Sequence, residues 1–230
     1  MIDYNEDVFK KISFHDKEMS NEMRMYGKQP LSEDEIEFVK NEIKTIQAQE
    51  DLFIFNDAEH LDRTCYNFID DVIYIGRNVF PDTLYGSTHP RDLMSVRAVI
   101  AHEYYGHRPY RNEYLNDIQK DIKTTPEWMD ECRASITASK ISSGLDLIDK
   151  IYLIQDAIKR AEEFGQWIQL DDYMKEVLFY GNHESEKNIS YPIGRITFIS
   201  ESGEKRDVPV WNGKRDLPKM RNKAKSEYTR

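Results

Sequence analysis

The chain has few of the residues that cross-linked or membrane-embedded proteins need. Only two of its 230 residues are cysteines, Cys65 and Cys132, which excludes a disulfide framework and suits a reducing compartment. It contains no run of 18 apolar residues, so we expect no membrane span. The first residues are acidic and lack an apolar signal core, so we expect a cytoplasmic protein, with export by a route that reads no N-terminal signal left open.

No stretch is rich enough in proline, glycine or serine to mark a second domain. We therefore expect an N-terminal arm at 1–28, a single domain at 29–212 and a basic tail at 213–230. The net charge of −10 argues against nucleic acid as the main partner. The last 17 residues carry seven Lys or Arg against two acids, a local charge of +5 that leaves −15 for the rest. We expect this tail to be solvated, with binding to an acidic surface as the alternative.

Patterns of helix and strand alternate along the first third of the chain. Ser32 and Glu35 form a capping-box sequence, which predicts a helix that begins there and continues to about Gln49. Two apolar runs at 52–55 and 71–76 predict strands, and we expect the segment at 65–69 to pair with the second of them. Further helical periodicity follows, so the fold class expected is α+β, mainly helical with a small mixed sheet.

The second half of the chain is predicted to have mainly a structural role. Apolar residues at helical spacing predict a long amphipathic helix from Ser143 to Trp167, followed by more helix from Asp171 to Tyr180. A late hairpin is predicted from two runs, 193–199 and 207–211. Pro209 lies in the second run and cannot donate a ladder hydrogen bond, so that run is expected at an edge.

One short motif, His102-Glu103-Tyr104-Tyr105-Gly106-His107, has the residue types of a hydrolytic zinc site. Two imidazoles supply ligands, and the glutamate lies beside them to move a proton. The histidines are five residues apart rather than the common four, which separates them by roughly 140° on a regular helix. Both can reach one metal only if the helix carries an extra residue as a π-bulge, and Gly106 is well suited to such a distortion.

A third ligand is predicted on the following helix. Threonines, Pro126 and Glu127 predict a helix start, with threonine at the cap and proline at the first position. That helix carries Glu131, 24 residues after His107, as the candidate ligand. Asp130 is placed to accept a hydrogen bond from a ligand imidazole. Cys132 points some 100° away from Glu131, so we expect it to be a small buried residue.

The two motifs together resemble a known family. H-E-Y-Y-G-H followed by D-E-C-R-A-S is similar to the H-E-L-L-G-H and E-E-C-R-A-E motifs of the dipeptidyl peptidase III zinc peptidases. The resemblance covers about a dozen residues and implies a zincin-like, gluzincin catalytic domain. It implies zinc bound by His102, His107 and Glu131, with Glu103 as general base. Ser135 replaces the last acid of the family's second motif, which leaves open what the ligand histidines contact there.

The resemblance and the motif together predict a zinc metallopeptidase acting on a peptide or protein substrate. Candidates for a transition-state or substrate contact are Tyr104, Tyr105, Arg133 and His183, with His89 a weaker one. By analogy with zincins, backbone groups at 74–78 would bind an extended peptide by strand addition. Two alternatives remain: a metal-dependent hydrolase of a non-peptide amide or ester, and a non-catalytic interaction protein. Without a metal, the histidines and Glu131 would be ordinary core or surface residues.

Overall fold

The computed structural model describes residues 29–81, 89–180 and 195–210, so the expected N-terminal arm and basic tail lie outside the described residues. The α-helices of the described part are α3 (Glu33–Thr45), α4 (Pro90–Leu93), α5 (Val96–Ala101), α6 (Arg111–Lys120), α7 (Glu127–Ile141), α8 (Leu147–Glu163) and α9 (Asp172–Lys175). Two π-helical segments are η4 (His102–His107) and η6 (Glu176–Tyr180). The 3₁₀ turns are η2 (Glu50–Leu52), η3 (Arg77–Val79) and η5 (Arg108–Tyr110). No described helix is both long enough and apolar enough to cross a bilayer.

The six described strands form two small sheets. The first combines β1 (Phe53–Phe55), β2 (Cys65–Asn67) and β3 (Val72–Ile75) in the order β1-β3-β2, with β1 parallel and β2 antiparallel to β3. The second combines β4 (Gln166–Ile168), β5 (Arg195–Ser200) and β6 (Lys205–Pro209) in antiparallel order. The α+β class with small sheets is therefore as expected, and so is the late hairpin with Pro209 on its edge strand.

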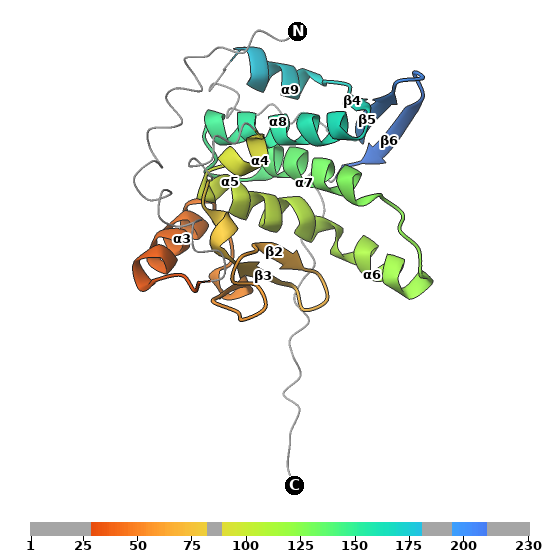
Figure 1. Ribbon diagram of the computed structural model, residues 1–230. Coiled ribbons are helices and arrows are strands. Elements are labelled where there is room, and N and C mark those ends of the chain that lie inside the picture. The colour runs from red at the N-terminus through yellow and green to blue at the C-terminus, as the bar shows by residue number, and fades with distance from the viewer. Residues whose placement is uncertain (1–28, 82–88, 181–194, 211–230) are drawn as a thin grey trace.

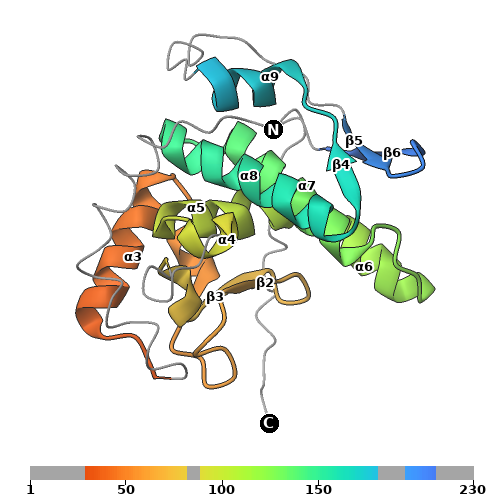
Figure 2. The same cartoon turned by 45° about the horizontal axis from the view of Figure 1, so that its top comes forward.

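The helices stack in layers between these sheets. Figure 1 shows the first sheet at the bottom, α5 above it, then α7 and α8, with α9 at the top and the second sheet at one end. In Figure 2, α5, α7 and α8 run side by side while α3 lies across their end. α7 is the central element, and nine of its residues are buried because it packs against η4 on one side and α8 on the other. It separates one apolar core around α3, α5 and the first sheet from another around α8, α9 and the second sheet.

Local sequence signals set several of these boundaries. The Ser32 hydroxyl caps α3 and Glu35 returns the bond to the Ser32 N–H, which confirms the predicted capping box. A second capping box, Asp146 with Asp149, begins α8. The helix predicted over 143–167 is therefore too long at both ends. It ends at Glu163, two residues before Gly165, whose φ of +62° favours glycine.

Two expectations about strand position and capping are wrong. The strand at 72–75 lies in the centre of its sheet, where Tyr74 pairs with Ile54 on one side and Cys65 on the other. It therefore has no free edge for a substrate; the edge strands are β1 and β2, and β2 is the one beside Glu103. The α7 helix begins one residue later than predicted, with Pro126 rather than a threonine at the cap. Thr124 instead bonds the Asp117 carboxylate at the end of α6.

A buried ion pair ties the first sheet to the π-helix. Arg108, directly after His107 and 2% exposed, donates two hydrogen bonds to Asp71 at the β2–β3 turn, at 3.0 and 3.2 Å. The Tyr66 hydroxyl donates to the same carboxylate at 2.8 Å. Pro109 is the second residue of η5, so the π-helix gives way to a 3₁₀ turn after the motif, where the sequence predicts a break or kink. The pair holds β2 against the segment that carries both histidines.

Candidate metal centre

The H-E-Y-Y-G-H segment is π-helical over its whole length, from His102 to His107. This confirms the bulge that the five-residue spacing predicts. In a regular α-helix these histidines would face different sides, whereas the wider turn brings them together. Their rings meet edge to face with centroids 4.8 Å apart, and both are buried, at 6% and 8% exposure.

Three side chains from two elements converge on one point. The Nε2 atoms of His102 and His107 are 3.1 Å apart. The Glu131 carboxylate on α7 lies 3.3 Å from the first and 3.5 Å from the second. The structure therefore brings together the three residues predicted to be ligands. The Glu103 carboxylate is also close, since its ligand atom and those of the two histidines all lie within 4.8 Å of one another.

The spacing of these three groups suits a tetrahedral ion. Ligands at about 2.0–2.2 Å from a zinc ion stand about 3.3–3.6 Å apart at the corners of a tetrahedron. The observed separations of 3.1, 3.3 and 3.5 Å are close to that range. Two histidines and one carboxylate are also a donor set that zinc takes. The two distances to Glu131 end on different oxygens of its carboxylate. In donor type and spacing, the residues present fit such an ion.

Glu131 stays ionised although it is largely buried. Burial raises the pKa of its carboxyl, but His107, His102 and Arg160 outweigh burial and hold the pKa well below its usual range. Arg160, on α8, places one guanidinium nitrogen 3.3 Å from Glu131 Oε2. The carboxylate is thus negative at neutral pH and can serve as a metal ligand.

The outer nitrogen of His107 is held by an acid, as predicted for Asp130. Asp130 Oδ2 lies 3.4 Å from His107 Nδ1, and the Tyr114 hydroxyl lies 3.2 Å from the same nitrogen while donating to Asp130. Burial raises the Asp130 pKa, but His107 and Arg133 outweigh it and bring the pKa to about 2. Burial lowers the pKa of His107, but Glu131 and Asp130 outweigh it and raise the pKa to about 9. Tyr114 is a contact that sequence reasoning missed, because only its apolar spacing was visible.

The outer nitrogen of His102 meets a different partner. Its Nδ1 lies 2.9 Å from the Ser135 hydroxyl, and Ser135 donates to Asp156 on α8 at 2.6 Å. Ser135 therefore does contact a candidate ligand histidine, although it is not an acid. Asp156 is fully buried and carried no motif signal in the sequence.

Glu103 is oriented by the sheet rather than by its own helix. Its Oε2 accepts a hydrogen bond of 2.9 Å from the backbone N–H of Tyr66 in the edge strand β2. Burial raises the pKa of the Glu103 carboxyl, and the nearby histidines and the Tyr66 N–H offset this only in part. A carboxyl with such a raised pKa can exchange a proton closer to neutral pH.

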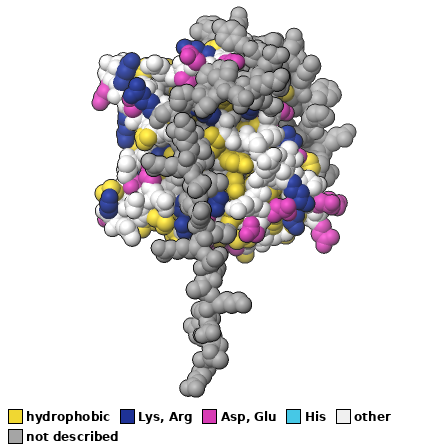
Figure 3. Space-filling model, turned by 180° about the vertical axis from the view of Figure 1, so that it is seen from behind, with side chains coloured by type: hydrophobic (Ala, Val, Ile, Leu, Met, Phe, Trp, Pro, Cys, Tyr) yellow, Lys and Arg dark blue, Asp and Glu magenta, His cyan; other side chains and the backbone are white. Residues whose placement is uncertain are grey.

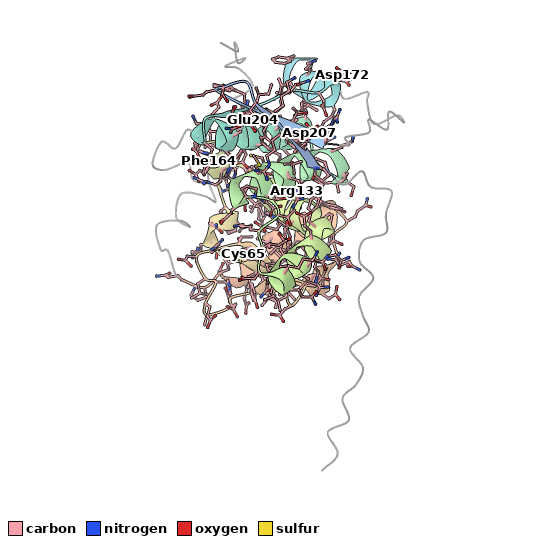
Figure 4. The ribbon with its side chains drawn as sticks, turned by 90° about the vertical axis from the view of Figure 1, so that its right-hand side faces the viewer. Cys65, Arg133, Phe164, Asp172, Glu204 and Asp207 are labelled. Atoms are coloured by element: carbon pink, nitrogen blue, oxygen red, sulfur yellow. The ribbon has the colours of Figure 1, made fainter. Side chains whose placement is uncertain are left out.

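A cleft of about 1340 Å³ opens over this cluster. Its walls come from β2, from α6 and the start of α7, and from the end of α8. Figure 4 labels Cys65 and Phe164, which line it from the lower and the upper part of the molecule. On the wall formed by α7 and α8, Trp128 and Phe164 stack with ring centroids 5.1 Å apart. Seen from behind, the described surface mixes charges of both signs with apolar side chains (Figure 3).

The candidate substrate contacts are not gathered at this cleft. The Tyr105 hydroxyl donates to the Ile46 carbonyl at 2.8 Å, at the end of α3, because its ring points into the first core. Arg133 is fully buried in the middle of the molecule (Figure 4), 3.7 Å from the Tyr110 ring centroid, with hydrogen bonds to Asp130 and Glu113. Neither lines the cleft, so their assignment as contacts needs correction.

The other candidates are also placed elsewhere or not described. Tyr104 is buried against Phe53 and Arg108. His89 caps α4 and pairs with Glu163. His183 lies outside the described residues. Cys132 is fully buried and donates to a carbonyl of α8, as expected for a small core residue.

Comparisons of the chain with protein-family models, with curated proteins and with solved structures found no match.

Proposed function

We propose that this chain is a zinc-dependent metallopeptidase with a zincin-like, gluzincin-type domain. His102, His107 and Glu131 would hold the ion, and Glu103 would act as general base. The proposal rests on the two sequence motifs and on the geometry that the fold gives them. A bound zinc ion would supply a Lewis acid and lower the pKa of a coordinated water to about 7.

One observation carries the proposal: the Nε2 atoms of His102 and His107 and the Glu131 carboxylate face one another across 3.1–3.5 Å. Asp130 can only accept from His107 Nδ1, so this ring presents an unprotonated Nε2 once the histidine is neutral. Glu131 is an acceptor as well. A proton on one nitrogen satisfies part of this arrangement, whereas a divalent cation satisfies all three groups together.

The other residues of the site have roles that follow from their contacts. Glu103, held by the Tyr66 N–H, would take the proton of a nucleophilic water and return it to the leaving amine. Its raised pKa brings it closer to the pH at which it must both accept and release that proton. Arg160 and Asp130 would keep the ligand carboxylate and His107 in place.

The cleft favours a peptide over a small amide or ester. It extends well beyond the cluster, with edge strand β2 on one side and exposed aromatic surface on the other. The Trp128–Phe164 pair can cover an apolar side chain of a bound peptide. A cut within a peptide therefore uses more of this surface than hydrolysis of a small molecule.

The test is the metal content of the purified full chain, by elemental analysis, for the wild type, His107→Ala and His60→Ala. His60 is a matched control because it stacks on Tyr74 and pairs with Asp57, away from the cleft. We expect about one zinc per chain in the wild type and in His60→Ala, and none in His107→Ala. A wild type that takes up no added zinc refutes the proposal.

A peptide-library cleavage assay on the zinc-loaded wild type then separates the reaction classes. Cleaved peptides support the peptidase. Zinc binding with hydrolysis only of small amides or esters identifies the non-peptide hydrolase, and zinc without any hydrolysis identifies an interaction protein.

A further inference from the structure

Ser135 connects one candidate ligand to an acid on another helix. It lies on α7, one turn after Glu131, and its hydroxyl is 2.9 Å from His102 Nδ1 and 2.6 Å from Asp156 Oδ2. Ser135 and Asp156 are both 0% exposed. Asp156 lies on α8, 21 residues further along the chain. The three groups form a continuous hydrogen-bonded line from the π-helix through α7 to α8.

The number of hydrogens available shows which group donates and which accepts at each step of this line. The Asp156 carboxylate accepts from Arg160 Nε at 2.9 Å and also takes the single hydroxyl hydrogen of Ser135. The Ser135 oxygen then has only lone pairs left and must accept from His102 Nδ1–H. A histidine protonated at Nδ1 presents a bare Nε2 lone pair towards His107 and Glu131.

We infer that Ser135 and Asp156 are positioning residues that hold His102 in its metal-binding tautomer and orientation. Asp156 on α8 supplies the negative charge, and the neutral Ser135 hydroxyl lies between it and His102. This inference rests on the proposed zinc site. It assigns to Ser135 a role that the motif resemblance left open and to Asp156 a role that no motif indicated.

Arg160 extends the same network to the carboxylate ligand. Its Nε donates to Asp156, while its Nη1 lies 3.3 Å from Glu131 Oε2. Asp156 therefore orders the site on two sides, directly through Ser135 and indirectly through Arg160. The buried Asp156 carboxylate thus accepts from a donor on each side, Ser135 and Arg160, as a buried charge requires.

A neighbouring serine shows what a purely structural hydroxyl does on this helix. Ser139 lies one turn further along α7 and is also 0% exposed, but its hydroxyl donates to the Ile136 carbonyl of the same helix. Ser135 uses its hydroxyl for two other elements instead. The two serines therefore provide a matched pair of substitutions.

The first experiment compares zinc affinity in the wild type, Ser135→Ala and Ser139→Ala by competition with a chelator. We expect Ser135→Ala to bind zinc about 10- to 100-fold more weakly, the range typical of lost contacts behind a ligand. Ser139→Ala should bind like the wild type. Equal affinities in the two variants overturn the inference, provided that circular dichroism shows both folded.

A double-substitution cycle tests the link between the two residues. If Ser135 acts only by passing on the contact of Asp156, then Ser135→Ala, Asp156→Asn and the double variant should lose affinity to a similar extent. Fully additive losses would show that the two residues act separately and would overturn the inference that Asp156 acts on His102 through Ser135. If Asp156→Asn fails to fold, the comparison of the two serine variants still decides.

Nitrogen-15 spectroscopy of the imidazoles gives a readout that a general loss of stability does not move. In the zinc-loaded wild type, His102 should carry its hydrogen on Nδ1. The nitrogen-15 signal of this Nδ1 should shift in Ser135→Ala but not in Ser139→Ala. A hydrogen-bonded Nδ1 signal unchanged in Ser135→Ala contradicts the inference. Absence of zinc from the wild type would refute the proposed function itself. Zinc bound equally well by all variants would refute only the positioning role of Ser135 and Asp156.

Discussion

Gly106 and Ala134 pack so closely that no side chain fits between them. A Cβ built on Gly106 would lie 2.6 Å from the Ala134 carbonyl oxygen and 2.9 Å from its Cβ. This is where the π-helix crosses α7. The close approach places Glu131, one turn before Ala134 along α7, within reach of both histidines. The glycine of the motif therefore has a packing role beside the conformational one that its sequence suggests.

We predict that Gly106→Ala destabilises the chain and weakens zinc binding. In an open helical position this change would stabilise by about 0.5–1 kcal/mol, because glycine is the poorer helix former. Here the added methyl must push α7 away, which costs about 1–3 kcal/mol as overpacking. Chemical denaturation and zinc titration measure the two effects. A stabilised variant with unchanged zinc affinity would show that the contact between Gly106 and Ala134 can accommodate a methyl group.

We predict that Glu103→Gln binds zinc normally but loses hydrolysis. The amide keeps the shape and can still accept the Tyr66 N–H, but it cannot take a proton. Removal of a general base costs about 10²–10⁴-fold in rate. The matched control is Glu127→Gln, an exposed carboxylate that lines the same cleft and pairs with Lys123. Turnover by Glu103→Gln at the rate of that control would assign the base elsewhere.

We predict a graded loss of zinc affinity from two adjacent acids on α7. Glu131→Gln removes a charged ligand and should lose the ion at micromolar zinc. Asp130→Asn removes only the contact behind His107 and should weaken binding about 10- to 100-fold. Competition titrations measure both. The reverse order would mean that Asp130, and not Glu131, is the ligand.

We predict that zinc affinity increases with pH up to about pH 9. Before the cation binds, the raised pKa of His107, about 9, keeps its ring protonated at pH 7. Zinc must displace that proton, so apparent affinity should rise about tenfold per pH unit between pH 7 and 9 and then level off. Calorimetry in buffers of different ionisation enthalpy counts the released protons: we expect about one at pH 7 and none well above pH 9.

The same histidine makes the stability of the zinc-free chain depend on pH in the opposite direction. Its folded pKa of about 9 lies above the ordinary value of 6.5. Its contribution to stability is therefore complete below about pH 6.5 and is lost as the pH rises through 9. Thermal unfolding of the chelator-treated wild type should show this decline, and His107→Ala should not. A melting temperature that rises over this range in the wild type would contradict the shift.

Much of the local structure follows from short-range signals. The Ser32–Glu35 capping box begins α3 as its sequence predicts, because capping involves groups only three residues apart. The five-residue histidine spacing predicted a π-helical turn, since helix geometry relates spacing directly to direction. The hairpin of β5 and β6 was visible for the same reason: its pairing is set by neighbours in sequence.

Other features depend on which elements pack together, and these were not predictable. β3 lies between β1 and β2, so the edge strand beside Glu103 is β2. Tyr105 and Arg133 belong to the two motifs but point into the core, because neighbours on a helix differ in direction by about 100°. Adjacency in sequence therefore says little about which side chain reaches the cleft.

The sequence by itself determined the candidate ligands, His102, His107 and Glu131, together with the helix distortion that they need. Residue type and spacing specify such a set because ligand chemistry and helix geometry are local. Only the tertiary structure decided what lies behind His102. Asp156 reaches His102 through Ser135 because α7 and α8 pack side by side, and no local pattern records a contact between two helices.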